Sequence, residues 1–153
     1  MAYLGKLRLV VIVDRLSRQR RSENMRRIRS KGMKPERIVG SLVHRLGYRF
    51  RLHAKELPGK PDIVRRPVKQ AILVHGCFWH QHPKTGCLDA RPPKSNRSYW
   101  LPKLARNVER DRQAIVALRS AGWKVLVVWE CETKHTELLK QKLEEFLRSS
   151  SGE

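Results

Sequence analysis

Residues 75–87 combine side chains that few purely structural segments need together. This segment contains two cysteines, three histidines and two adjacent aromatic residues. It follows residues 71–74, an apolar run that is typical of a buried strand. Open α/β sheets tend to place their chemistry at the carboxyl ends of their strands. We therefore expect residues 75–87 to form the chemically active end of the molecule.

The cysteines and one histidine have the spacing of a metal site. Four residues separate Cys77 from His82, four more separate His82 from Cys87, and the remaining cysteine ends the last predicted strand. Three cysteines cannot all pair within one chain, so thiolates and an imidazole around a structural zinc ion are the simplest explanation. Two buried thiols with surface histidines are the alternative, and His75 and His80 compete with His82 for the fourth position. The candidate ligands are Cys77, His82, Cys87 and Cys131.

A second site is predicted around Asp62, which begins a short strand after a proline- and glycine-containing turn. If this strand lies beside the apolar run, the Asp62 carboxylate and the Val74 carbonyl meet near one end of the sheet. The imidazoles of His75 and His80 lie at the same end. A hard cation such as Mg²⁺ binds carboxylate, backbone oxygen and water, and it can hold a scissile phosphate while activating the attacking water. The arrangement suits phosphodiester hydrolysis, although a Pro-Asp pair alone commonly starts a turn or strand for local reasons.

Hydrophobic periodicity predicts one α/β domain that brings these residues together. Apolar residues at helical spacing indicate three helices, and β-prone runs indicate strands. A strand, a long helix and a strand in succession predict a crossover connection, and residues 88–98 are expected to form a surface loop. Trp123 and Trp129 are assigned to the core. The expected helices cover residues 35–46, 104–120 and 136–148, and the expected strands cover residues 48–52, 62–64, 71–74 and 123–129.

The chain carries a large positive charge for its length. Its 153 residues include 34 Lys and Arg against 14 Asp and Glu, which gives a formal net charge of +20. This excess is more than solubility requires and predicts a polyanionic partner. The basic residues are spread over several segments, and no run approaches the ~20 apolar residues of a membrane helix. We therefore expect a cytoplasmic protein that binds nucleic acid and no membrane, and charge alone leaves RNA as an alternative to duplex DNA.

Six separated motifs together resemble the very short patch repair (Vsr) endonuclease family. The resemblance extends from about Asp14 to Leu147 and implies a PD-(D/E)xK nuclease core, in which a mixed central sheet is flanked by helices. Residues 1–13 would then be a flexible N-terminal extension, residues 14–148 the endonuclease domain and residues 149–153 a disordered tail. The motifs are Asn24-Met25-Arg26, Pro35-Glu36, Leu57-Pro58-Gly59-Lys60-Pro61-Asp62, His75-Gly76-Cys77-Phe78-Trp79-His80, Asn107-Val108-Glu109-Arg110-Asp111 and Val127-Val128-Trp129-Glu130-Cys131.

The resemblance also implies an activity, which is nicking one strand of duplex DNA beside the T of a T:G mismatch by Mg²⁺-dependent hydrolysis. Such a mismatch is the lesion left when 5-methylcytosine is deaminated. Asp62 and the Val74 carbonyl would bind Mg²⁺, and His80 would be the general base. Most PD-(D/E)xK nucleases carry an acidic residue, a spacer and a lysine where this chain has Leu73-Val74-His75, and the Vsr family shares that departure. The implied catalytic residues are Asp62, His80, His75 and Asp111, with Glu36 orienting metal-bound water.

Further residues carried over from the family concern zinc and DNA. Its structural zinc ligands match the four residues found above from spacing. Its mismatch wedge matches Met25, Phe78 and Trp79, and Trp100 is assigned to DNA contact with them. Without this context, two adjacent aromatic residues are more often one core ring and one surface ring.

The expected partner is mismatched double-stranded DNA, bound by a monomer in the bacterial cytoplasm, and other mismatch-repair proteins are further candidate partners. Two alternatives to this function remain. One is a restriction-like or other lesion-specific nicking enzyme, and the other is a non-catalytic zinc-bearing DNA-binding module.

Overall fold

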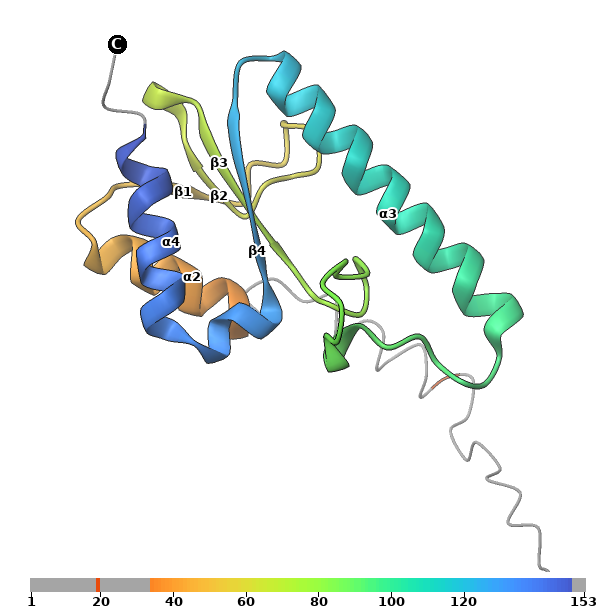
Figure 1. Cartoon of the computed structure of the whole chain (residues 1–153). Helices are drawn as coiled ribbons and strands as arrows, with labels where there is room; N and C mark the ends of the chain where they lie inside the picture. The colour runs from red at the N-terminus through yellow and green to blue at the C-terminus, as the bar shows by residue number, and fades with distance from the viewer. Residues whose placement is uncertain (1–18, 20–33, 150–153) are drawn as a thin grey trace, which may run out of the picture. The chain divides into compact units, whose positions relative to one another are not determined.

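The structure, a computed structural model, describes Gln19 and residues 34–149 (Figure 1). The predicted N-terminal extension, Met25 and residues 150–153 lie outside this part of the chain. Residues 34–149 form the predicted α/β fold with a mixed sheet, whose four strands lie in the order β1-β2-β3-β4. The strands are β1 (Arg51–Leu52), β2 (Ile63–Arg65), β3 (Gln70–His75) and β4 (Lys124–Trp129), and the helices are α2 (Lys34–Arg45), α3 (Arg97–Ser120) and α4 (Thr136–Arg148).

The sheet is mixed, and its directions determine which residues meet. Strands β1 and β2 are antiparallel, β2 and β3 are antiparallel, and β3 and β4 are parallel. Because β2 runs opposite to β3, the residue before β2 lies beside the end of β3. Because β3 and β4 are parallel, their last residues, His75 and Trp129, pair with each other. The sheet therefore gathers three chain segments at one edge, which is where the sequence places the chemistry.

Helices cover both faces of the sheet (Figure 1). Helices α2 and α4 pack on one face and α3 on the other, joined to β4 by a short turn. Helix α2 contains Pro35 and Glu36 in its first turn, positions that suit a fixed φ and a negative charge near the positive end of the helix dipole. The two cores are Val39, Leu42, Val43, Ile63, Ile72, Val128, Leu139, Leu143 and Leu147 on the first face, and Ala54, Val64, Ala71, Leu73, Leu118 and Trp123 on the second.

Helix α3 begins earlier than the sequence predicts. The expected loop ends and the helix starts at Arg97, so that Pro102 lies inside it. Proline has no backbone N–H, so Pro102 cannot donate a helical hydrogen bond. The turn before it is nevertheless hydrogen-bonded, because the N–H groups of Tyr99 and Trp100 donate to the Asn96 carbonyl at 3.1 and 3.2 Å. The longer helix therefore includes the aromatic residues Tyr99 and Trp100. Strand β1, in contrast, is shorter than the predicted strand over residues 48–52.

The turn before β2 packs closely under α3. Gly59 has a φ of +72°, and a Cβ placed on it would lie 2.8 Å from the Ala114 side chain. Only glycine combines this backbone conformation with such a close approach. The turn is therefore fixed against α3 three residues before Asp62.

Candidate active site and metal-binding cluster

Asp62 directly precedes β2, and both its backbone and its side chain form hydrogen bonds with β3. Its N–H donates to the Ile72 carbonyl at 3.1 Å, and its Oδ2 accepts the N–H of Val74 at 2.7 Å. Burial is the main cause that raises the pKa of Asp62 to about 7, and the charge of Glu36 raises it further. The hydrogen bond from the Val74 N–H and the charge of His80 lower the pKa of Asp62. A divalent cation beside this carboxylate would remove the cost of ionising it, so the side chain suits a cation ligand.

Three side chains form a candidate cation site around this carboxylate. Glu36, His53 and Asp62 each offer one ligand atom, and these atoms lie within 4.8 Å of one another. Glu36 comes from the first turn of α2, and His53 directly follows β1. Two carboxylates and an imidazole fit a divalent cation such as Mg²⁺ or Mn²⁺. The sequence predicts Glu36 and Asp62 as members of this site but not His53, because only the register of β1 on β2 places His53 there.

A second group at the same edge consists of His75, His80 and Asp111. Its ligand atoms also lie within 4.8 Å of one another. His80 Nδ1 lies 2.5 Å from Asp111 Oδ2 on α3, and the rings of His75 and His80 stack with centroids 4.0 Å apart. Burial, followed by the charge of His80, lowers the pKa of His75 to about 4, while Asp111 opposes this shift. His75 is therefore neutral at neutral pH, and His80 is oriented by a carboxylate, as in a group that transfers protons.

The four residues with zinc-ligand spacing come together as the sequence predicts. One ligand atom from each of Cys77, His82, Cys87 and Cys131 lies within 4.8 Å of the others. His82 Nδ1 lies 3.7 Å from the Cys77 sulfur and 3.5 Å from the Cys131 sulfur. His75 and His80 belong instead to the group with Asp111, so His82 is the histidine that lies with the cysteines in this structure. The group joins the loop after β3 to the 3₁₀ turn Glu130–Lys134, which follows β4.

The electrostatics of this group favour a bound cation over free thiolates. Burial is the main cause that raises the pKa of Cys77, to about 12, and that also raises the pKa of Cys131. Burial lowers the pKa of His82, so its imidazole is neutral at neutral pH. Neutral imidazole and thiolates are the ligand forms that zinc requires, and a divalent cation offsets the cost of ionising buried thiols. The donor set therefore fits a metal ion of this kind.

Trp129 links the two groups of side chains. Its indole stacks on His82 with ring centroids 4.3 Å apart and meets His75 edge-on at 5.3 Å. The assignment of Trp129 to the core is wrong, because the residue is only partly buried and lies outside both core clusters. It is the last residue of β4, directly before the 3₁₀ turn that carries Cys131. Trp123, in contrast, is buried in the core beneath α3 as predicted.

Four aromatic residues gather where the loop after β3 meets the start of α3. Phe78 lies 5.1 Å from Trp79 and 5.5 Å from Trp100 between ring centroids, and Tyr99 lies 5.2 Å from Trp100. The Lys103 ammonium group lies within 5.7 Å of the Trp79, Tyr99 and Trp100 ring centroids. Phe78, Trp79 and Trp100 are partly buried, and none belongs to either core cluster. Phe78, Trp79 and Trp100, three of the four residues assigned to DNA contact, thus lie with Tyr99 in one aromatic patch beside the Lys103 ammonium group, and Met25 lies outside the described residues.

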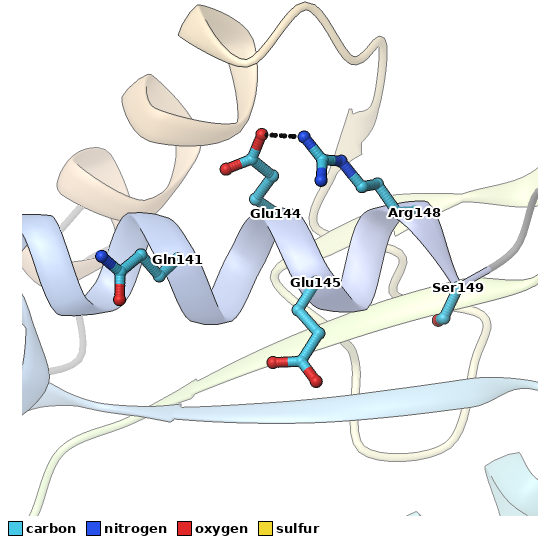
Figure 2. A pocket seen from close by; sticks show the side chains of 5 residues that line it. All are labelled: Gln141, Glu144, Glu145, Arg148 and Ser149. Carbon is cyan, nitrogen blue, oxygen red and sulfur yellow. Dashed lines mark hydrogen bonds and ion pairs between the residues drawn. The ribbon is translucent and has the colours of Figure 1, made fainter.

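Other surface features of the described part lie outside these groups. On α3, Glu109 forms an exposed ion pair with Arg112 at 2.7 Å. A shallow depression on α4 is lined by polar and charged side chains and contains no candidate site residue (Figure 2). None of the helices in residues 34–149 is both long and apolar enough to span a membrane. The lining residues of the depression are Gln141, Glu144, Glu145, Arg148 and Ser149.

Comparison with known proteins places this arrangement in a family. The sequence model of the family "DNA mismatch endonuclease Vsr" matches residues 13–85, a span that contains Asp62, His75 and His80. The type II nicking enzyme V.XorIIP of Xanthomonas oryzae pv. oryzae is 47% identical over 139 residues, which cover 91% of this chain and 100% of that protein. The type II nicking enzyme V.NmeAIP of Neisseria meningitidis is 39% identical over 137 residues, covering 90% and 96%. The DNA mismatch endonuclease Vsr of Escherichia coli K12 is 40% identical over 132 residues, covering 83% of each chain. The chain therefore belongs to the Vsr family and is a DNA endonuclease.

Proposed function

We propose that this endonuclease nicks one strand of duplex DNA beside the T of a T:G mismatch by Mg²⁺-dependent hydrolysis. The observation that carries the proposal is the convergence of a partly buried carboxylate, Asp62, with a histidine–aspartate pair, His80 and Asp111, at one edge of the sheet. The charge of His80 lowers the pKa of Asp62, so the two groups interact electrostatically. Membership in a mismatch endonuclease family supports the substrate.

In this proposal, Asp62 and the Val74 carbonyl hold the cation. Mg²⁺ bound there supplies positive charge that positions the scissile phosphate and lowers the pKa of water. Val74 is already fixed beside Asp62, because its N–H donates to the carboxylate at 2.7 Å. Glu36 enters from the first turn of α2 and orients water at the cation. The start of β2, strand β3 and the first turn of α2 would thus together position the cation and the scissile phosphate.

His80 is the general base of the proposed reaction. Asp111 contacts its Nδ1 at 2.5 Å, which leaves Nε2 as the ring atom that accepts the proton of the attacking water. His75 stacks on the His80 ring and, with a pKa lowered to about 4, supports it at pH 7 without adding a positive charge. The stack and the carboxylate together define the orientation of the base.

DNA recognition is assigned to the aromatic patch. Phe78, Trp79 and Trp100, with Met25, would wedge between base pairs beside the mismatch, where unstacking costs least. The group formed by the three cysteines and His82 would hold a structural zinc ion, which ties the loop that carries Phe78 and Trp79 to the end of β4. The zinc group would then hold the loop in place while the Phe78 and Trp79 rings contact DNA.

We extend the proposal to the setting of the reaction. Residues 14–148 are taken as one endonuclease domain with a PD-(D/E)xK core, preceded by an extension and followed by a tail. The protein would act as a monomer on mismatched double-stranded DNA in the cytoplasm, with other mismatch-repair proteins as further partners.

The test compares the wild type with Asp62→Asn on a T:G duplex in Mg²⁺. Loss of the cation ligand should slow nicking by about 100-fold or more while gel-shift affinity at fixed salt changes little. Asp89→Asn is the matched control, because Asp89 pairs with Lys134 on the surface and lies outside the candidate site. Rapid nicking by Asp62→Asn would refute the role of Asp62. Equal nicking of T:G and T:A duplexes by the wild type would favour a restriction-like nicking enzyme.

A further inference from the structure

His53 is placed beside Asp62 by the pairing of the first two strands. Leu52 pairs with Ile63 in the antiparallel β1–β2 ladder, and the pairing continues one step further because the His53 N–H donates to the Asp62 carbonyl at 2.9 Å. The register therefore brings His53 directly opposite Asp62, while its φ of +53° takes its backbone out of the extended strand conformation.

The imidazole also belongs to a group assembled from distant parts of the chain. Its ligand nitrogen, an oxygen of Asp62 and an oxygen of Glu36 all lie within 4.8 Å of one another. The three residues come from the end of β1, the start of β2 and the first turn of α2. All three side chains are partly buried. This geometry is that of a three-residue cation site with one nitrogen and two oxygen donors.

We propose that His53 is a nitrogen ligand of the cation held at Asp62 and that it makes this site favour Mn²⁺ over Mg²⁺. The inference rests on the proposed cation-dependent function and adds to it a ligand that determines metal selectivity. Divalent transition metals accept imidazole readily, whereas Mg²⁺ keeps oxygen ligands and water. Carboxylates serve both ions, so the selectivity of the site depends on the imidazole.

The substitution His53→Asn removes the imidazole with little strain in the backbone. His53 has a φ of +53°, and asparagine adopts this left-handed conformation more readily than most residues. The matched control is His44→Asn, because His44 is an exposed histidine in the last turn of α2 and lies outside all three groups. Both variants are compared with the full-length wild type as purified, so that the cysteine group keeps its metal.

The experiment titrates Mn²⁺ into each protein without DNA and follows free and bound Mn²⁺ by electron paramagnetic resonance. Pulsed measurements on the bound ion report magnetic coupling to a ligand nitrogen. We expect the wild type and His44→Asn to show a nitrogen coupling that is absent in His53→Asn. The Mn²⁺ affinity of His53→Asn should fall by ~10-fold or more, whereas Mg²⁺ affinity, measured by competition, should fall by less than ~3-fold.

The outcomes separate this inference from the proposed function. If Mn²⁺ binding requires Asp62 but His53→Asn keeps both the affinity and the nitrogen coupling, the role of His53 is refuted and the cation site stands. If Asp62→Asn binds Mn²⁺ as tightly as the wild type, the cation site itself is refuted, and His53 with it. If His53→Asn alone loses the coupling and the Mn²⁺ preference, the inference holds even where no T:G nicking is found.

Discussion

The raised pKa of Asp62 predicts a steep pH dependence of cation binding. Burial in the cation-free protein holds the pKa of this carboxyl at about 7, compared with 3.8 for an ordinary aspartate. A cation ligand must be ionised, so a proton and the cation compete for the same oxygen atoms. Acid should therefore weaken cation binding at pH values where an ordinary aspartate is already fully charged.

The size of the effect follows from the ionised fraction of the carboxyl. With a pKa of about 7, roughly nine tenths of the groups are ionised at about pH 8, one tenth at about pH 6 and one hundredth at about pH 5. The apparent dissociation constant for Mn²⁺ should therefore rise about 10-fold between pH 8 and 6 and about 100-fold between pH 8 and 5. A carboxyl with a pKa of 3.8 would give almost no change over this range.

Binding is a better measurement than stability, because two residues of the site affect stability in opposite directions. Asp62, with a raised pKa, stabilises the cation-free fold at low pH and loses this contribution as pH rises through about 7. His75, with a lowered pKa, stabilises the fold above its ordinary value of 6.5 and loses this contribution as pH falls towards about 4. The two contributions partly cancel in a melting experiment.

The assay is a Mn²⁺ titration at several pH values, in the wild type and in His53→Asn, where titration of that imidazole cannot contribute. His53→Asn should show the loss of affinity in acid that follows from Asp62 alone. Asp62→Asn serves as the control and should lose tight binding at every pH. A dissociation constant that stays flat between about pH 5 and 8 in His53→Asn would refute the assignment of a buried, proton-binding Asp62 as the cation ligand.

Three further predictions concern the other groups. Cys131→Ser should lower the zinc content below one ion per chain and lower the melting temperature, because it disconnects the loop after β3 from the end of β4; elemental analysis that still finds a full zinc complement would contradict this. Asp111→Asn should slow nicking of a T:G duplex by ~100-fold or more with DNA affinity retained, because His80 loses the carboxylate that orients it, and an unchanged rate would exclude that role. The double variant Phe78→Ala, Trp79→Ala should lose its preference for T:G over T:A duplexes but keep most of its stability, whereas truncation of one buried core aromatic costs ~3–5 kcal/mol. A collapsed melting temperature with an unchanged preference would overturn the wedge assignment.

The sequence predicts those parts of the site that lie close together along the chain. The cysteines and His82 are identified by spacing, and the order of strands around α3 places Cys131 beside them. The end of β3 beside Asp62 follows from one assumption about neighbouring strands, which the β2–β3 pairing confirms. These successes depend on short loops, where spacing along the chain limits distance in space.

Features that depend on exact pairing or on tertiary contacts are not visible in the sequence. His53 directly follows a two-residue strand, and nothing in the neighbouring sequence marks it as a site residue until the register of β1 on β2 is known. Trp129 is a large apolar residue in a β-prone run, as a core residue would be, yet it ends β4 and packs on two histidines of the site. Pro102 marks a helix start by local rules, but packing of Trp100 against Phe78 favours an earlier start at Arg97.

The most direct test of the central claim is a panel of otherwise identical duplexes that carry each mismatch and the matched pairs. Each duplex is incubated with the protein and Mg²⁺, and the nick is mapped on both strands. The proposed function predicts a single nick beside the T of the T:G duplex, at a rate well above that of every other duplex, and no nicking without a divalent cation. Nicks at equal rates in matched and mismatched duplexes, or on the strand that carries the G, would contradict it.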